Sequence, residues 1–186
     1  MKVYHSLLNS FVAALLALFF TLPAAQAQTA ALDDLFTRLQ TADAAAAGRI
    51  EREIWLEWSK SGSPSMDLLL QRGRDAMDVG DLPAAIEHLT ALIDHAPEFA
   101  EGWNARATAY FMAGEVGPSI DDIAHTLSLN PRHFGALAGL GMIFEEIGKP
   151  EKALEVYRAA LAIHPQMTEV RDSVERLEIE IAGQDL

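Results

Sequence analysis

The architecture of this chain can be read from residues 134–167, which run FGALAGLGMIFEEIGKPEKALEVYRAALAIHPQM. Gly148 and Pro165 in this stretch each recur upstream at a constant step of 34 residues. The recurring residues are the glycines Gly80, Gly114 and Gly148 and the prolines Pro97, Pro131 and Pro165. A fixed period of this length is typical of repeat proteins, in which each unit stacks on the next. The step divides the chain into the units 66–99, 100–133 and 134–167.

Each unit predicts two helices joined by a tight turn. The first helix of the third unit ends at Gly148, since glycine readily adopts the left-handed conformation that closes a helix. The second begins at Pro150, which a first helical turn tolerates, and it ends before Pro165. One position in each first helix is small enough for a close approach of the two helices. These positions are Gly73, Ala107 and Gly141.

The pattern of large and small residues resembles the tetratricopeptide repeat (TPR) family. The third unit matches the family pattern most fully, at Leu137, Leu140, Gly141, Phe144, Ala153, Tyr157 and Pro165. The resemblance covers residues 66–167 and implies an all-α solenoid of helical hairpins that binds protein partners. The first two units carry Arg72 and Arg106 where the family usually has leucine. We expect these arginines to reach solvent or to pair with nearby acids.

Both ends of such an array need a cap, because each repeat buries its hydrophobic face against a neighbour. At the C-terminus, residues 168–186 predict a capping helix and tail. Its apolar residues recur at helical spacing, at Val170, Val174, Leu177 and Ile181. At the N-terminus, residues 28–64 predict a degenerate hairpin. The predicted fold is therefore an all-α TPR solenoid of three repeats, within residues 65–167, with a degenerate N-terminal hairpin and a C-terminal capping helix.

Two of the three tryptophans lie close together in the degenerate hairpin. Trp55 and Trp58 stand one period before Leu89 and Leu92, which are core positions of a second helix. We therefore predict that the two tryptophans seal the first repeat, each burying roughly 150–250 Å². The alternative is that they form an exposed aromatic site for a partner protein.

The first 27 residues have the layout of a secretory signal peptide. Lys2 precedes an apolar run of 12 residues, Phe11–Leu22, and the small-x-small triplet Ala25-Gln26-Ala27 follows. The run is short for a membrane-spanning helix of roughly 20 residues, so we expect cleavage after Ala27 and no stable membrane insertion afterwards. An uncleaved membrane anchor is the alternative. The expected location is the periplasm of a bacterium.

The composition excludes several functional classes. The net charge of −13 argues against a nucleic-acid partner, since phosphate binding needs clustered Lys and Arg. The absence of cysteine excludes disulfides, thiolate nucleophiles and Cys-ligated zinc. The histidines form no metal-binding pair, and we expect them to be surface or corner residues. No nucleophile, base and orienting group can be assembled, so no enzyme activity, metal or cofactor is expected.

In the TPR family, the first helix of each repeat lines a concave, peptide-binding groove. The resemblance therefore implies a groove built from all three units of this chain. The predicted groove residues are Leu70, Arg74, Met77, Asn104, Thr108, Phe111, Met112, Met142 and Glu145. Further acids are expected at its edge, at Asp67, Asp78, Glu101 and Glu146. A bound segment would then be apolar with some basic residues.

Methionines contribute much of the expected floor of this groove, and their flexible side chains adapt to varied ligands. The alternative is that Met77, Met112 and Met142 are ordinary filling between helices. The residues with which some members of the family hold a terminal carboxylate are absent. The residues Leu70, Ala105, Gly135 and Gly139 stand at those positions.

These observations predict a periplasmic interaction scaffold or assembly adaptor that binds a peptide segment of an envelope protein. The alternative is a structural accessory subunit of a larger envelope complex. A groove scaffold should retain an isolated peptide, whereas an accessory subunit should need its whole folded partner. The identity of the partner and the oligomeric state stay open. So does the choice between the groove and the end of the molecule that carries Trp55 and Trp58.

Overall fold

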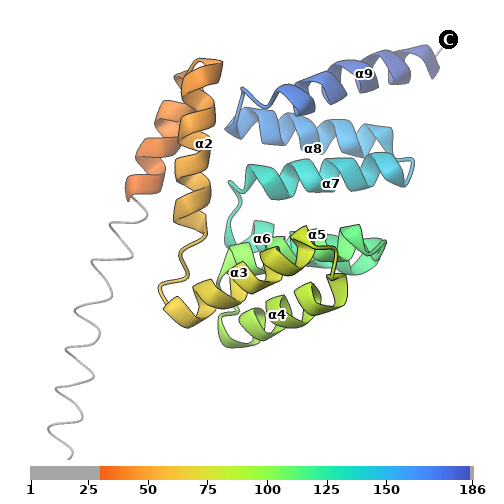
Figure 1. Cartoon of the computed structure of the whole chain (residues 1–186). Helices are drawn as coiled ribbons and strands as arrows, with labels where there is room; N and C mark the ends of the chain where they lie inside the picture. Colours follow the sequence, from red (N-terminus) through yellow and green to blue (C-terminus); the bar gives the residue numbers. More distant parts are fainter. Residues whose placement is uncertain (1–29, 185–186) are drawn as a thin grey trace, which may run out of the picture.

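The computed structural model describes residues 30–184, and within this range it contains helices and their connections but no strand (Figure 1). The predicted signal peptide, residues 1–27, lies outside the described residues. None of the helices between residues 30 and 184 combines the length and the apolar character needed to cross a membrane.

The helices follow one another with short connections. The first covers residues 30–41. The others are α2 (Ala44–Trp58), α3 (Pro64–Asp78), α4 (Leu82–His95), α5 (Ala100–Met112), α6 (Val116–Leu129), α7 (Phe134–Glu146), α8 (Pro150–Ile163) and α9 (Thr168–Gln184). The pairs α3–α4, α5–α6 and α7–α8 correspond to the three units of the period. The all-α solenoid of helical hairpins predicted from the sequence is confirmed.

Glycine closes the first helix of each unit. The closing residues are Gly80 (φ 77°), Gly114 (φ 76°) and Gly148 (φ 68°). A left-handed backbone of this kind is readily adopted only by glycine, which explains why glycine recurs at this position. In the first unit, the Gly80 amide donates to the Met77 carbonyl (2.9 Å) and the Asp81 amide donates to the Ala76 carbonyl (2.8 Å). These two bonds satisfy carbonyl groups that the end of α3 leaves open.

Small residues let the two helices of a unit interlock. A Cβ atom added to Gly73 would lie 2.5 Å from Cγ of Leu89. One added to Gly141 would lie 2.5 Å from Cδ1 of Tyr157. Ala107 is buried at the same position of the second unit. Because packed interiors leave no room for an extra carbon atom, these positions hold each hairpin closed.

The arginine that replaces an apolar residue in the second unit is paired with a buried carboxylate. Arg106 donates two hydrogen bonds to Asp122 (2.7 and 2.9 Å) and one to Thr90 Oγ1 (3.0 Å). Its guanidinium also lies over the Trp103 ring, 5.2 Å from the ring centroid. The hydrogen bonds to Asp122 raise the pKa of Arg106, which keeps it charged. Arg72 is exposed.

The N-terminal hairpin, formed by helix 30–41 and α2, packs at the junction of the second and third repeats. The Trp58 ring stacks on the His133 ring, with centroids 4.2 Å apart, and its centroid lies 5.0 Å from that of Phe134. These two partners stand at the start of α7. The core of the first repeat, which contains Leu89 and Leu92, includes neither tryptophan. The prediction that the tryptophans seal the first repeat is therefore wrong.

The hairpin lacks the small positions that would let it stack on the first repeat as a further unit. Leu39 stands one period before Gly73, and Glu51 stands one period before Ala85. Because Leu39 is large and fully buried, it fills the space that a close helix approach would need. The connection to α3 also turns differently, since Gly62 has a φ of 83°. As a result, α2 crosses the direction of α7 and α8 (Figure 1).

Hydrogen bonds join the hairpin to the far end of the chain. Gln40 Nε2 donates to the carbonyl oxygens of Ala162 (2.9 Å) and Ile163 (2.7 Å). Gln166 Nε2 donates to the carbonyl oxygen of Ala42 (3.0 Å). We call these three bonds the clasp. The clasp fixes the N-terminal hairpin to the end of α8 and to the connection that follows it, so segments from the two ends of the chain are joined.

The last helix, α9, stands where the first helix of a fourth unit would stand. It begins at Thr168, one period after Phe134, the first residue of α7. Its apolar residues Val170, Val174 and Leu177 are buried in a cluster with residues of α8. In this way α9 covers the hydrophobic face of the third repeat and also extends the row formed by α5 and α7.

Candidate functional site

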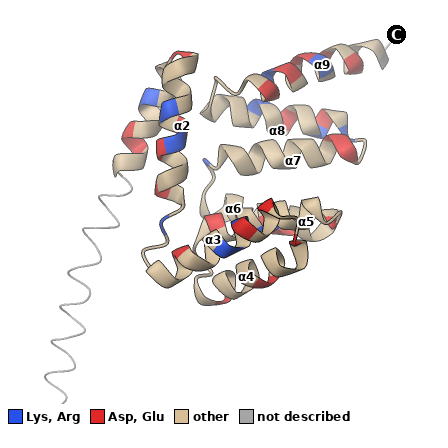
Figure 2. Ribbon diagram, in the orientation of Figure 1, with Lys and Arg blue, Asp and Glu red and all other residues tan. Residues whose placement is uncertain are grey.

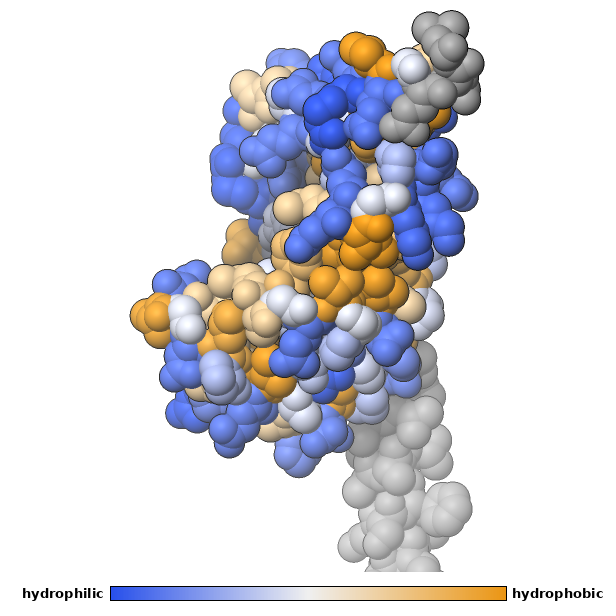
Figure 3. Space-filling view, turned by 90° about the vertical axis from the view of Figure 1, so that its right-hand side faces the viewer, coloured by the Kyte–Doolittle hydropathy of each residue, from blue (hydrophilic) through white to orange (hydrophobic). Residues whose placement is uncertain are grey.

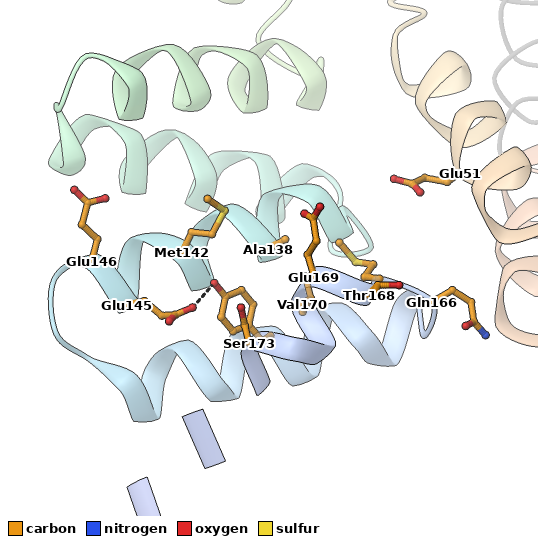
Figure 4. A pocket seen from close by; sticks show the side chains of 12 residues that line it. Glu51, Ala138, Met142, Glu145, Glu146, Gln166, Thr168, Glu169, Val170 and Ser173 are labelled. Carbon is orange, nitrogen blue, oxygen red and sulfur yellow. Dashed lines mark hydrogen bonds between the residues drawn. The ribbon is translucent and has the colours of Figure 1, made fainter. Parts of the chain in front are cut away.

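A cavity of about 870 Å³ lies between α7, α9 and α2 (Figure 4). We call it the α7–α9 cavity. Its lining combines apolar side chains with four glutamates. The lining residues are Glu51, Ala138, Met142, Glu145, Glu146, Tyr157, Gln166, Met167, Thr168, Glu169, Val170 and Ser173.

A second cavity of about 240 Å³, which we call the α5–α7 slot, lies between α5 and α7. Ala138 and Met142 line both cavities, so the two spaces meet along α7. The room in the slot comes partly from Gly139, where an added Cβ atom would have no heavy atom within 4 Å. The lining residues are Asn104, Ala107, Thr108, Phe111, Ser119, Ile123, Gly135, Ala136, Ala138, Gly139, Met142 and Ile143.

The repeat places these residues in a row. Thr108 and Met142 are one period apart, and so are Gly139 and Ser173. Because first helices of successive units stack in register, the same face of each contributes to one surface. Figure 3 shows hydrophobic surface gathered across the middle of the molecule, between two hydrophilic regions. The candidate site is therefore an extended surface with an apolar centre.

The α7–α9 cavity is lined by four glutamates and by no lysine or arginine. Helix α7, which borders both cavities, carries no basic residue along its whole length (Figure 2). Glu145 is compensated, since it accepts a hydrogen bond from the Tyr157 hydroxyl (2.7 Å) and pairs with Arg176. Burial, together with the bond to Glu145, raises the pKa of Tyr157, so its phenol stays neutral. Glu146 and Glu169 are exposed and have no ion pair with any described residue.

Glu51 reaches the α7–α9 cavity from α2 (Figure 4). Its carboxylate lies 3.4 Å from His164 Nε2, and it accepts a hydrogen bond from Trp55 Nε1, also at 3.4 Å. The hydrogen bond with His164 holds the pKa of Glu51 below its usual range, so Glu51 is ionised at neutral pH. An ionised carboxylate only accepts hydrogen bonds, so the proton of this bond belongs to Nε2 of His164. The other ring nitrogen, Nδ1, is buried without a hydrogen-bond partner among residues 30–184.

The structure brings five of the nine predicted groove residues into these cavities. Glu145 lines the α7–α9 cavity and Met142 lines both. Asn104, Thr108 and Phe111 line the α5–α7 slot. Met142 is 53% exposed, so it is a surface residue of the cavities rather than filling between helices.

The four other predicted residues lie elsewhere. Leu70 is 1% exposed inside the first repeat, so the expectation that it lines a groove is wrong. Met77 packs against the same core as filling between helices. Met112 is 51% exposed but lines neither cavity. Arg74 is held by Glu101, to which it donates a hydrogen bond of 2.5 Å. The surface therefore begins at the second repeat instead of the first.

Two of the acids expected at the groove edge stabilise connections between elements. Glu101 is buried and accepts hydrogen bonds from Asn104 Nδ2 (3.2 Å) and from Arg74, while His133 Nε2 lies 2.9 Å from it. Asp67 accepts a hydrogen bond from the Ser61 amide (2.8 Å) in the connection before α3. The expected place of Glu101 at the edge of a groove is wrong, because its carboxylate is buried and already paired. Asp67 is half-buried, and its place at the edge stays a prediction.

The N-terminal hairpin marks one end of the surface. A Cβ atom added at Gly135 would lie 2.7 Å from Cη2 of Trp55, so Trp55 covers this position of α7. The Trp55 ring also packs edge-on against Phe134, with centroids 5.8 Å apart. Trp58 is only 8% exposed. The two tryptophans thus join the hairpin to the third repeat. The alternative of an exposed aromatic site is excluded for the buried Trp58. It stays a prediction for Trp55, which is half-buried and lines a surface pocket with Leu56 and Arg74.

The residues that the sequence analysis missed come from α9 and α2. Glu169 and Ser173 stand one period beyond Gly135 and Gly139, and both line the α7–α9 cavity. Extending the repeat by one helix would have identified them. Glu51 has no such signal, because its position depends on how the hairpin docks and not on the period.

The described residues contain no group of His, Asp or Glu side chains that could hold a metal ion. His133 and His164 are corner residues as expected, since each stands at a helix end, but both are buried instead of exposed. The Nδ1 atom of His133 accepts a hydrogen bond from the Ala136 amide (3.1 Å) at the start of α7.

Known proteins share this architecture. A family model described as "Tetratricopeptide repeat" matches residues 70–124 and 119–168. A TPR repeat-containing protein of Rhizobium etli is 38% identical over 153 residues, which cover 82% of this chain and 75% of that protein. The small glutamine-rich tetratricopeptide repeat-containing protein 2 of Saccharomyces cerevisiae is 31% identical over 117 residues. This match covers 63% of the chain but only 34% of the yeast protein.

Solved structures with the same fold include the crystal structure of MamA protein, with a TM-score of 0.60 and 24% identity. That match covers 87% of this chain and 86% of the other. The first TPR of Spaghetti, bound to the HSP90 peptide SRMEEVD, gives a TM-score of 0.60 and 22% identity. It covers 63% of this chain and 93% of the other. At such identities the likeness establishes the fold alone.

Proposed function

This chain is a member of the tetratricopeptide repeat family, and from this premise we propose that it is a non-enzymatic protein-interaction module. It would hold a peptide segment of a partner protein in the α7–α9 cavity and the α5–α7 slot. The observation that carries the proposal is the cavity of about 870 Å³ between α7, α9 and α2. Ligand pockets typically have volumes of roughly 300–1,000 Å³. The peptide bound to the first TPR of Spaghetti supports a peptide as the class of ligand.

The lining of the cavity supports binding without catalysis. Thr168 and Ser173 are its aliphatic hydroxyl residues, and among the described residues neither hydroxyl is hydrogen-bonded to a histidine or a carboxylate that could act as its base. The Tyr157 hydroxyl is occupied by its bond to Glu145. A nucleophile needs an adjacent base, and that base needs an orienting group. The lining supplies no such set.

The test compares two similarly exposed methionines, one inside the cavities and one outside them. The chain is immobilised and exposed to a soluble extract of its source organism, and retained proteins are quantified by mass spectrometry. We expect Met142→Ser to lower retention of the partner by about tenfold or more, because burying a methionine side chain contributes roughly 1.5–3 kcal/mol. Met112→Ser is the matched control, since Met112 is 51% exposed against 53% for Met142 but lines neither cavity.

A partner retained by the wild-type and Met112→Ser chains but lost by Met142→Ser would support binding in the two cavities. Equal retention by both variants would show that the partner binds elsewhere. Circular dichroism of both variants must match the wild-type spectrum. Since both side chains are exposed, neither substitution removes a core residue.

We also propose that the module acts after export, in a bacterial periplasm, as a scaffold or assembly adaptor for an envelope protein. The signal-type layout around Lys2 and Ala27 supports this location. When the whole chain is expressed in a bacterium and the cells are fractionated, mass spectrometry should find a periplasmic protein that begins at Gln28. A protein that retains Met1 and sediments with membranes would overturn this part of the proposal.

A further inference from the structure

We propose that the bound segment carries a large apolar side chain close to a lysine or arginine. The α5–α7 slot would take the apolar side chain, and the glutamates of the α7–α9 cavity would take the cation. This inference rests on the proposed function and adds the chemical class of the ligand.

The slot is built for an apolar side chain. Phe111, Ile123 and Ile143 line it, and its volume of about 240 Å³ gives room for one large side chain but not for a helix. Its hydroxyl groups already have partners. The Ser119 hydroxyl donates to a backbone carbonyl of α5 at 2.8 Å, and the Thr108 hydroxyl donates to another at 3.1 Å. An apolar ligand therefore leaves no hydroxyl of the slot unsatisfied.

The neighbouring cavity supplies the preference for a cation. Glu51 is ionised, and Glu146 and Glu169 have no ion pair among residues 30–184. Because Ala138 and Met142 line both spaces, a segment anchored in the slot continues along α7 into the cavity that these glutamates line. Residues of an extended chain advance by about 3.3 Å each, so the residues next to the anchor lie within reach of the cavity. A lysine or arginine there would pair with carboxylates that the fold leaves unpaired.

The same charges disfavour acidic segments. The peptide bound to the first TPR of Spaghetti, SRMEEVD, contains three acidic residues and one arginine. Such a peptide would place carboxylates beside those of Glu146 and Glu169, and like charges in a partly desolvated site repel. The net charge of −13 adds long-range repulsion of the same sign. This chain should therefore bind basic peptides in preference to acidic ones.

The probe is a library of random dodecapeptides displayed on phage, selected on the purified chain and on three variants. Gly139→Leu fills the slot, and the double variant Glu146→Gln with Glu169→Gln removes two charges from the cavity. Gly117→Leu is the control, because Gly117 is another helical glycine with nothing within 4 Å of an added Cβ atom, and it lies outside both cavities. The variants alter open or exposed positions, so each should keep the fold. Circular dichroism verifies this.

We expect the wild-type and Gly117→Leu chains to enrich peptides in which Leu, Met or Phe stands within two residues of Lys or Arg. The enrichment should be about tenfold over the input library, the factor expected of one anchoring side chain. Gly139→Leu should lose this enrichment because its own side chain occupies the slot. The double glutamine variant should keep the apolar preference and lose the preference for Lys and Arg. If Gly139→Leu does not fold, Gly139→Ala should reduce the apolar preference by narrowing the slot.

Enrichment of acidic or uncharged peptides by the wild-type chain would overturn this inference. The proposal that the chain is a protein-interaction module would be unaffected. If Gly139→Leu enriched the same peptides as the wild-type chain, the apolar side chain would not bind in the α5–α7 slot, and the inference would be wrong. Absence of any enrichment would also overturn it. In each case the comparison of Met142→Ser with Met112→Ser decides the proposed function separately.

Discussion

Replacing Trp58 with alanine will lower the free energy of unfolding by about 3–5 kcal/mol, the range measured when a large buried aromatic side chain is truncated. Trp58 is 8% exposed, and its ring packs against His133, Phe134 and Phe36, with centroids 4.2, 5.0 and 6.0 Å away. Packed neighbours relax only partly into the space that a truncated side chain leaves. The cavity should therefore persist in the variant.

Urea unfolding followed by circular dichroism measures this effect, and Leu56→Ala is the matched control on the same helix. Leu56 is 65% exposed, so its truncation should change the free energy of unfolding by no more than about 0.5 kcal/mol. Hydrogen exchange locates the damage. Protection should fall in α2 and at the start of α7, whereas α3 and α4 keep theirs. Equal stability of the two variants would show that the hairpin does not dock through Trp58.

Replacing Gly141 with alanine will destabilise the third repeat by about 1–3 kcal/mol, the usual cost of overpacking a filled core. The new Cβ atom would lie 2.5 Å from Cδ1 of Tyr157 and closer still to Cε1. The ring has little freedom to move, since Tyr157 is buried and its hydroxyl is bonded to Glu145. Either the hairpin of α7 and α8 opens, or the ring shifts and loses this bond.

Gly139→Ala, two residues away on the same helix, is the control for this prediction. An added Cβ atom at Gly139 meets nothing within 4 Å. Alanine also restricts the unfolded chain more than glycine does, so this variant should gain roughly 0.5–1 kcal/mol. Thermal unfolding of the two variants should therefore shift in opposite directions. A Gly141→Ala chain as stable as Gly139→Ala would mean that the helices do not interlock at this position.

Much of the fold could be predicted because the 34-residue period reflects contacts within each hairpin and between neighbouring hairpins. Glycine recurs at the position of Gly148, where a left-handed residue must close a helix, and a small residue recurs at the position of Gly141, where a second helix passes close by. Each requirement concerns one hairpin and its neighbour, so it repeats with the unit. The positions Asn104, Thr108 and Met142 were implied by the resemblance to the TPR family, and the structure places all three in the cavities.

The position of the N-terminal hairpin could not be predicted from the period. Trp55 and Trp58 match the register of a second helix, but register alone does not fix which surface an element packs on. Docking here depends on the stack of Trp58 on His133, a contact that links different units and has no counterpart one period away. The same docking brings Glu51 to the site. Recognition residues that depend on such contacts leave no periodic signal in the sequence.

The clasp has a consequence for the order in which the molecule assembles. Gln40 and its partner Ala162 are 122 residues apart, so synthesis of the intervening chain takes on the order of ten seconds. In a simple solenoid each unit can fold against its neighbour as soon as both exist. Here the segment made first must wait for one made nearly last, with its tryptophan face exposed in the meantime. A chain stopped before His133 would form the first two repeats and leave the N-terminal hairpin with nowhere to bind.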